Sequence, residues 1–231
     1  MKKIEAKSII KGFLVLVFFT YSYLFQYIPI YLFHIQVNDL RGNYILSVLF
    51  STFSSILIFI VLLFVYRKDL KDDLKIFLKD PLVHLNDGIV YWIIGLAVMC
   101  CSNIFLATFF HSNGANNENV VQAMIAAYPI IMGIDVCFLA PFNEELVYRK
   151  TFYDIIPNRK IFVILSFFVF GYVHVSSMAT NYVDWLYMIP YGALGCAFAA
   201  AYSKTDTVYT SMFLHMIHNV AIFLMSVISF I

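Results

Sequence analysis

The chain has 231 residues, of which 62% are hydrophobic, 18% are aromatic and only 13% are charged. Soluble globular domains are about half apolar and a quarter charged, so this composition predicts a membrane protein surrounded by lipid. The formal net charge is +1 and the basic residues form no stripe, which argues against a nucleic-acid partner.

Seven apolar runs are long enough to cross about 30 Å of hydrocarbon, and they predict an all-α fold. We expect a polytopic bundle of about seven, at most eight, transmembrane helices. The runs cover residues 9–34, 44–66, 88–110, 120–142, 161–178, 185–203 and 207–230. The first run follows a basic N-terminus like that of a signal peptide, but it has no small-residue cleavage site, so we expect it to remain as a helix. The stretch 120–156 is too long for one straight span, and we predict a kink at Pro141.

Between the second and third runs lies a segment of different composition. Residues 67–87, RKDLKDDLKIFLKDPLVHLND, mix charges with scattered apolar side chains, and we predict a cytosolic loop with an amphipathic helix at the membrane surface. Four cysteines lie in the apolar runs and match no zinc pattern, so we interpret them as small packing residues. They are Cys100, Cys101, Cys137 and Cys196.

The distribution of basic residues predicts the orientation in the membrane. With seven spans, all 15 Lys and Arg residues except Arg41 fall on the N-terminal side. Because cytoplasmic loops are enriched in Lys and Arg, we predict a cytosolic N-terminus and an external C-terminus.

A few ionisable or amide side chains lie inside the predicted spans, where such groups are costly and suggest function. They are Asp135, Glu144, Glu145, Arg149, His174, His215, His218 and Asn219. Each also has a structural interpretation, since a lone His can be a packing residue and Glu145 with Arg149 can form a self-neutralising i,i+4 pair. For Asp135 we expect a hydrogen bond inside the bundle.

Helix geometry predicts whether these side chains converge. At a rise of 1.5 Å per residue, Glu144 lies about 20 Å before the next hairpin turn, and His174 lies about 22 Å beyond that turn. His215 lies about 15 Å past the last turn, with Asn219 one turn deeper on the same helix face. Three helices thus bring their strong polar groups to one layer, and we predict a shared site there. The same estimate places Arg149 inside the bundle, and removing Arg149 from the count of basic residues leaves the predicted orientation unchanged.

This set of side chains has the parts of a hydrolytic site. A glutamate in an apolar pocket can act as general base toward water, a role that we assign to Glu144 with His174 sharing or orienting the proton. His215 and Asn219, at i,i+4, present N–H donors in one direction, which suits an oxyanion hole. Arg149 would hold the acidic pair in charge balance.

The alternative chemistry is metal ligation, in which Glu144, His174 and His215 would bind zinc with an open position for water. No HExxH pattern occurs and Asn219 is a poor zinc ligand, so we expect no cofactor and keep zinc as the alternative. The chain also shows no serine elbow and no nucleotide-binding glycine motif. An aspartyl intramembrane protease would need a second aspartate beside Asp135.

Three short motifs resemble those of the CPBP family, the CAAX-protease and bacteriocin-processing membrane enzymes also called ABI proteins. EELVYR at 144–149 resembles the family's EExxxR motif, FGYVH at 170–174 its FxxxH motif, and HMIHN at 215–219 its HxxxN motif. They occur in the family's order on successive membrane segments. The resemblance divides the chain into N-terminal membrane helices, 1–118, and a catalytic helical core, 119–231.

The resemblance implies an intramembrane endopeptidase of the glutamate type. By matching positions, Glu144 and His174 would activate water and the HxxxN pair would form the oxyanion hole. The residues carried over are Glu144, His174, His215 and Asn219 as catalytic groups, with Glu145 and Arg149 as their support. Family members are described both as metalloproteases and as metal-independent, so the resemblance leaves the metal open.

Two positions depart from the family's pattern. Tyr148-Arg149-Lys150 stands where Phe-Arg-Gly is common, and Asn143 precedes the glutamate pair where apolar or small residues are common. Both departures lie beside the chemical positions and remove none of them.

The substrate follows only from the resemblance. A short, minimally decorated chain like this one resembles the bacterial members, so we expect a multi-pass protein of a bacterial cell membrane. Its partners would be membrane lipids and a membrane-bound peptide or lipoprotein substrate. Acyl transfer or an accessory role in lipoprotein N-acylation is the first alternative, and a non-catalytic bacteriocin-immunity protein is the second.

Overall fold

The computed structural model describes residues 5–22, 24, 27–32 and 44–229, and its regular structure there is entirely helical, which confirms the all-α prediction. The longer helices are α1 (Ala6–Ser22), α4 (Tyr44–Phe77), α5 (Pro81–Phe110), α6 (Asn116–Ala127), α10 (Arg159–Val175), α12 (Met188–Thr205) and α13 (Val208–Ser229). The short ones are α2 (Tyr27–Leu32), α7 (Pro129–Ile134), η2 (Asp135–Leu139), α8 (Ala140–Glu144), η3 (Glu145–Lys150), α9 (Thr151–Ile155) and α11 (Tyr182–Leu186). Arg41 and the end of the predicted first span lie outside the described residues.

Three helices in the described part of the chain are long and apolar enough to cross a membrane. They are Val48–Phe77 within α4, and the whole of α5 and α13. Helices α1 and α10 have 17 residues each and α12 has 18. A membrane protein is therefore supported, while the number of seven spans and the cytosolic N-terminus stay predictions.

The prediction of a loop with a separate surface helix over residues 67–87 is wrong. Helix α4 continues to Phe77, and α5 begins at Pro81 after a turn of three residues. The segment holds no glycine or proline before that turn, so nothing in it stops a helix. Asp80 caps the next helix by accepting a hydrogen bond from the backbone N–H of Val83 at 3.4 Å, and Pro81 fits the first helical position.

An ionic network holds the charged end of α4 against neighbouring helices. Lys11 Nζ lies 3.0 Å from Asp69 Oδ2 and 3.7 Å from Asp154 Oδ2. Lys150 Nζ lies 3.6 Å from Asp73 Oδ1 and 3.4 Å from Asp154 Oδ1. These contacts join α1, α4, η3 and α9 at one end of the bundle. The lysine that replaces the family's common glycine is therefore a buried partner in this network.

The predicted fourth span is a broken helical run that extends to Ile155. The break lies at Tyr128, which leaves helical geometry with φ −140° and ψ 65°, and α7 begins at the following proline. The run then passes through Pro141 without a break, and the kink predicted at this residue stays a prediction. Two wide π-helical turns, η2 and η3, flank the short α8 instead. Such turns inside α-helices are frequent at functional sites.

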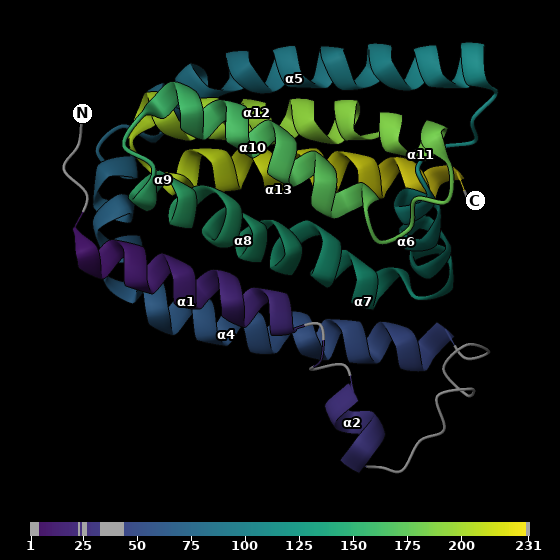
Figure 1. Ribbon diagram of the computed structural model, residues 1–231, viewed down its shortest axis with the longest axis horizontal. Coiled ribbons are helices and arrows are strands. Elements are labelled where there is room, and N and C mark those ends of the chain that lie inside the picture. Colours follow the sequence, from purple (N-terminus) through teal and green to yellow (C-terminus); the bar gives the residue numbers. More distant parts are fainter. Residues whose placement is uncertain (1–4, 23, 25–26, 33–43, 230–231) are drawn as a thin grey trace.

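The helices pack as layers along one long axis (Figure 1). Helices α5, α12 and α10 lie on one side, α1 and α4 on the other, and α13 with α8 between them. Small residues let α10 and α12 approach closely. A Cβ added at Gly195 would lie 2.6 Å from Phe170 Cβ, and one at Gly171 would lie 2.6 Å from the Met188 carbonyl oxygen. This contact fixes α10 and with it the FxxxH motif.

Candidate active site

The EExxxR motif lies at the junction of α8 and the π-helical turn η3. Glu144 ends α8, and Glu145 begins the π turn that contains Arg149. Arg149 Nη1 lies 3.3 Å from Glu145 Oε1, and both side chains are 0% exposed. The two charges therefore face the interior of the bundle, as the depth estimate for Arg149 predicts.

Glu145 also contacts the third motif. His215 Nδ1 donates a hydrogen bond to Glu145 Oε1 at 3.0 Å, so this carboxylate joins η3 to α13. Because Nδ1 makes this hydrogen bond, the Nε2 atom of His215 points away from Glu145 and can contact a bound molecule in the site. The sequence suggests the pair with Arg149, whereas the contact with His215 comes only from the fold.

Glu144 faces histidines from two further helices. Its Oε2 atom lies 4.0 Å from His174 Nε2 and 3.9 Å from His215 Nε2. The Glu144 and His174 side chains are 21% and 18% exposed, so this part of the site opens to its surroundings, whereas the Glu145–Arg149 pair behind it does not. The predicted convergence of the three helices is thus what the structure shows.

The ring of His174 is fixed from both sides. Its Nδ1 atom donates to the Phe170 carbonyl at 2.9 Å within α10, which leaves Nε2 directed at Glu144. Tyr191 of α12 stacks on the ring, with centroids 4.7 Å apart. Holding one ring nitrogen by a backbone carbonyl selects the tautomer in which the other nitrogen accepts a proton. Tyr191 carries no motif, so sequence reasoning did not find it.

Aromatic rings enclose the buried arginine. The Arg149 guanidinium lies 4.2 Å from the ring centroid of Phe170 and 5.5 Å from that of Phe198. Phe198 also stacks on His215 at 4.6 Å. Desolvated guanidinium–aromatic contacts of this kind stabilise a cation that has few hydrogen-bond partners. Among the described residues, the nitrogens of Arg149 have no hydrogen-bond acceptor in ideal geometry.

Asn219 lies one turn beyond His215 on α13, but its amide is already engaged. Its Nδ2 atom donates to the Val136 carbonyl at 2.8 Å, which ties α13 to the π turn η2. The second N–H of the amide remains available in principle. The structure therefore places Asn219 beside the site without bringing it into contact with Glu144.

Two other polar residues of the predicted set, His218 and Asp135, contact other parts of the bundle. His218 packs edge-to-face against Trp92 and Phe198, each at 6.4 Å, on the side of α13 that meets α5 and α12. Asp135 is buried and approaches the Ser55 hydroxyl of α4. This contact is the kind of bundle-facing interaction expected for it, although its Oδ1 atom has no hydrogen-bond partner within the described residues.

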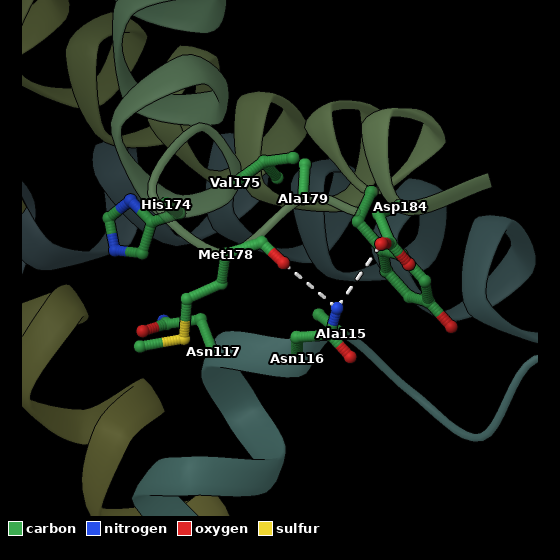
Figure 2. Close-up of a pocket in the computed structure, with 9 residues that line it drawn as sticks. Ala115, Asn116, Asn117, His174, Val175, Met178, Ala179 and Asp184 are labelled. Carbon is green, nitrogen blue, oxygen red and sulfur yellow. Dashed lines mark hydrogen bonds between the residues drawn. The ribbon is translucent and has the colours of Figure 1, made fainter. Parts of the chain in front are cut away.

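The far end of the site is covered by the loop after α10 and the start of α6. Asn116 Nδ2 donates to the Met178 carbonyl at 3.0 Å and to Asp184 Oδ2 at 3.2 Å. Figure 2 shows His174 and Asn117 on one side of the small pocket at this junction, with the Asn116 hydrogen bonds on the other. The pocket volume is about 10 Å³, so it holds at most about one water molecule.

The distances between the candidate ligand atoms test the zinc alternative. In the described part of the chain, no group of three or more His, Cys, Asp or Glu side chains is arranged to hold a metal ion. Ligand atoms about 2.0–2.1 Å from a tetrahedral zinc lie roughly 3.4 Å from one another. The separations of 4.0 and 3.9 Å from Glu144 to the two Nε2 atoms are wider, so the three side chains do not fit zinc as they stand.

The fold and the site define an all-helical membrane protein in which adjacent glutamates face histidines from two further helices. Residues 126–221 match the family model described as Type II CAAX prenyl endopeptidase Rce1-like. This match confirms the resemblance to the CPBP family that the three motifs indicate. No solved structure matches the chain.

Curated relatives from two bacteria are similar to the chain. One is named "Putative membrane peptidase YdiL" of Bacillus subtilis (strain 168), 24% identical over 185 residues, which cover 77% of this chain and 71% of that protein. Another is UPF0177 protein YvdC of Lactococcus lactis subsp. lactis (strain IL1403), 28% identical over 133 residues, or 55% of this chain and 49% of that protein. UPF0177 protein YxdF of the same strain is 24% identical over 149 residues, or 60% of this chain and 78% of that protein. The family model and the first relative support a membrane peptidase.

Proposed function

We propose that the chain is an intramembrane endopeptidase that hydrolyses a peptide bond in a membrane-associated peptide or protein, lipidated or not. The observation that supports this most strongly is the position of Glu144, whose Oε2 atom faces His174 Nε2 at 4.0 Å and His215 Nε2 at 3.9 Å. These separations are too long for direct hydrogen bonds and leave room for a water that bridges the groups.

In the proposed reaction, Glu144 takes a proton from this water, and the oxygen of the water attacks the carbonyl carbon of the scissile bond. His174 orients the water, because its Nδ1 is held by the Phe170 carbonyl and its Nε2 accepts. The C–N bond then breaks, and the proton passes from Glu144 to the leaving amine. One water is consumed, and one carboxylate and one amine are produced.

His215 is proposed to stabilise the oxyanion that forms in this step. Its Nδ1 already donates to Glu145, so donation from Nε2 requires the doubly protonated, cationic ring. The charges allow this, because Glu144, Glu145 and Arg149 together carry a net charge of −1 that one added proton neutralises. The Glu145–Arg149 pair then acts as a support that holds His215 in place.

We propose that this reaction proceeds without a metal ion. If zinc were bound, Glu144, His174 and His215 would hold it and it would activate the water. The width of the gaps between their ligand atoms argues for the metal-free version.

We also propose seven membrane passes with a cytosolic N-terminus. Helices α1, α4, α5, α10, α12 and α13 and the run from α7 to α9 lie along the long axis in Figure 1. The basic partners Lys11 and Lys150 meet aspartates at one end of this bundle. An excess of lysine at one end is typical of the cytosolic side.

A mutant series tests the proposed function. The full chain in lipid nanodiscs would be incubated with a library of fluorescence-quenched octapeptides, and the cleaved peptides identified by mass spectrometry. We expect Glu144→Gln and His174→Ala each to reduce kcat by about 10²–10⁴-fold while the circular dichroism spectrum is unchanged. His218→Ala, an intramembrane histidine outside the site, is the control that keeps activity. Full activity in both site variants would contradict the proposal.

A further inference from the structure

The charged end of α4 carries its basic and acidic side chains on different faces. Its last turns, RKDLKDDLKIF at 67–77, hold four basic and three acidic residues, a formal charge of only +1. At about 100° per residue, the basic side chains fall within one face of the helix, whereas Asp69 and Asp73 fall on the opposite face. The members of this basic face are Arg67, Lys68, Lys71 and Lys75. The nearly neutral composition therefore conceals a basic surface.

The acidic side chains of the opposite face are neutralised inside the bundle. Asp69 Oδ2 lies 3.0 Å from Lys11 Nζ of α1, and Asp73 Oδ1 lies 3.6 Å from Lys150 Nζ of η3. Asp73 Oδ2 also accepts a hydrogen bond from the backbone N–H of Val208 at 3.1 Å, at the start of α13. These two carboxylates are therefore engaged away from the basic face and do not offset its charge.

Three members of the basic face have no acidic partner. Asp72, at the edge of the face, lies 2.8 Å from Lys75 Nζ, with both side chains well exposed. The side chains of Arg67, Lys68 and Lys71 are exposed, and none of them forms an ion pair with the described part of the chain. Like charges on one face repel each other, so a counter-charge from outside the chain would stabilise this surface.

The basic face begins where the apolar part of α4 ends. Residues 44–66 are long enough, at about 34 Å, to cross the hydrocarbon core of about 30 Å. The basic face then extends about 12 Å further, and the headgroup layer on each side of a bilayer is roughly 5–8 Å thick. The Arg67 guanidinium lies 4.5 Å from the ring centroid of Phe64, which is 65% exposed, and aromatic rings are typical of this boundary. The face thus lies at the level of lipid phosphates.

We propose that the basic face of α4 is a docking surface for the headgroups of anionic phospholipids, with their phosphates beside Arg67, Lys68 and Lys71. Basic clusters next to a membrane span attract anionic lipids, and the guanidinium fork matches a phosphate. The depth of the face favours a lipid over a soluble acidic protein, because the cluster starts at the last apolar turn of the span. A lipid on this face and the ionic network on the opposite face then hold the end of α4 from both sides. The inference uses no residue of the proposed active site and holds whether or not the chain is a peptidase.

Native mass spectrometry of the full chain, released from a neutral detergent, tests this surface by resolving each bound lipid. Phosphatidylglycerol and phosphatidylcholine of equal chain length would be titrated separately. We expect the wild type to bind the first phosphatidylglycerol at least about tenfold more tightly than phosphatidylcholine. Lys68→Gln with Lys71→Gln should weaken phosphatidylglycerol binding by about tenfold or more, at roughly fivefold for each lysine, and leave phosphatidylcholine binding unchanged.

The matched control makes the same change in charge at the same end of the bundle. Lys160 in the first turn of α10 and Lys204 in the last turn of α12 are exposed, and Lys160→Gln with Lys204→Gln should weaken phosphatidylglycerol binding less than twofold. Lys68→Arg with Lys71→Arg keeps the charge and should keep the affinity. Glycerol phosphate, which has the anionic group without acyl chains, should not compete at equal concentration.

Three results would overturn the docking surface. They are equal affinity of the wild type for the two lipids, equal weakening by the two glutamine double variants, and full competition by glycerol phosphate, which would indicate a site for soluble anions. Circular dichroism of each variant checks that the fold is retained, which is expected because the substituted side chains are exposed.

Discussion

Arg149→Met should destabilise the fold strongly, because it leaves the Glu145 carboxylate charged in the interior. Both side chains are 0% exposed and lie 3.3 Å apart, and the guanidinium also packs 4.2 Å from the Phe170 ring. Removing one partner of a buried pair costs about 3–5 kcal/mol. At roughly 2–4 °C per kcal/mol for a chain of this size, the unfolding temperature should fall by about 6–20 °C. The hydrogen bond from His215 Nδ1 at 3.0 Å remains on the Glu145 carboxylate.

The assay is thermal unfolding of the purified protein in one detergent, followed by circular dichroism. The double variant Glu145→Gln with Arg149→Met removes both charges and should recover most of the loss, so the two sites show a coupling energy of about 2 kcal/mol or more. Lys204→Met is the matched control, since Lys204 faces Asp87 at 3.9 Å with both side chains well exposed, and an exposed pair is worth about 1 kcal/mol or less. An unfolding temperature of Arg149→Met equal to that of wild type would refute the reasoning, as would losses that simply add in the double variant.

Three further predictions concern packing, the loop after α10 and the metal. Gly195→Ala would place a Cβ 2.6 Å from Phe170 Cβ, so we expect it to lower the free energy of unfolding by about 1–3 kcal/mol. Gly133→Ala, whose nearest contact is the tip of the Phe223 ring at 3.0 Å, should lower it less. Equal losses in a thermal unfolding assay would be inconsistent with close packing of α10 on α12. Outside the spans, the backbone N–H of Thr180 holds the pKa of Asp184 below its usual range. The Asp184 carboxylate therefore stabilises the fold above a pH of about 4, and this contribution is lost as the pH falls through the lowered pKa. Asp184→Asn should therefore unfold at a lower temperature than wild type at pH 7, with the gap closing in acid; a gap independent of pH would contradict this. Treatment with 1,10-phenanthroline should leave peptide cleavage unchanged, and a loss that zinc alone restores would favour the metal alternative.

The depth of the site could be predicted from the sequence, because the rise of a helix is fixed. Counting residues from the hairpin turns brings Glu144, His174 and His215 to one layer, and in the structure they meet within 4.0 Å. The same counting places Arg149 inside the bundle, where it is fully buried. Polar residues in apolar spans are few, so their positions along each helix carry most of the information.

The lateral arrangement could not be predicted, because depth says nothing about how each helix is rotated. The contact of Glu145 with His215, the placement of His218 away from the site and the stacking of Tyr191 on His174 all depend on that rotation. The two π-helical turns change the rotation within a single run, and no residue type marks them in the sequence.

The extent of α4 shows a second limit of pattern reasoning. A change from apolar to charged composition at residue 67 suggests that the span ends there, but a helix ends only where its backbone is capped or broken. The chain supplies that stop at Asp80 and Pro81, three turns further on. Two of the charged side chains in between, Asp69 and Asp73, find partners in the ionic network at the end of the bundle, and the Lys11–Asp69 pair is 3.0 Å apart.

The central claim is that Glu144 activates a water that attacks a peptide carbonyl. The most direct measurement is cleavage of one octapeptide by the full chain in water enriched in ¹⁸O, with the mass of the new C-terminal product read by mass spectrometry. We expect one ¹⁸O atom in the new carboxylate for the wild type, and a rate at least about 10²-fold lower for Glu144→Gln. A product without ¹⁸O that carries an amine-derived group would contradict hydrolysis and point to acyl transfer, and an unchanged rate in Glu144→Gln would remove Glu144 from the chemistry.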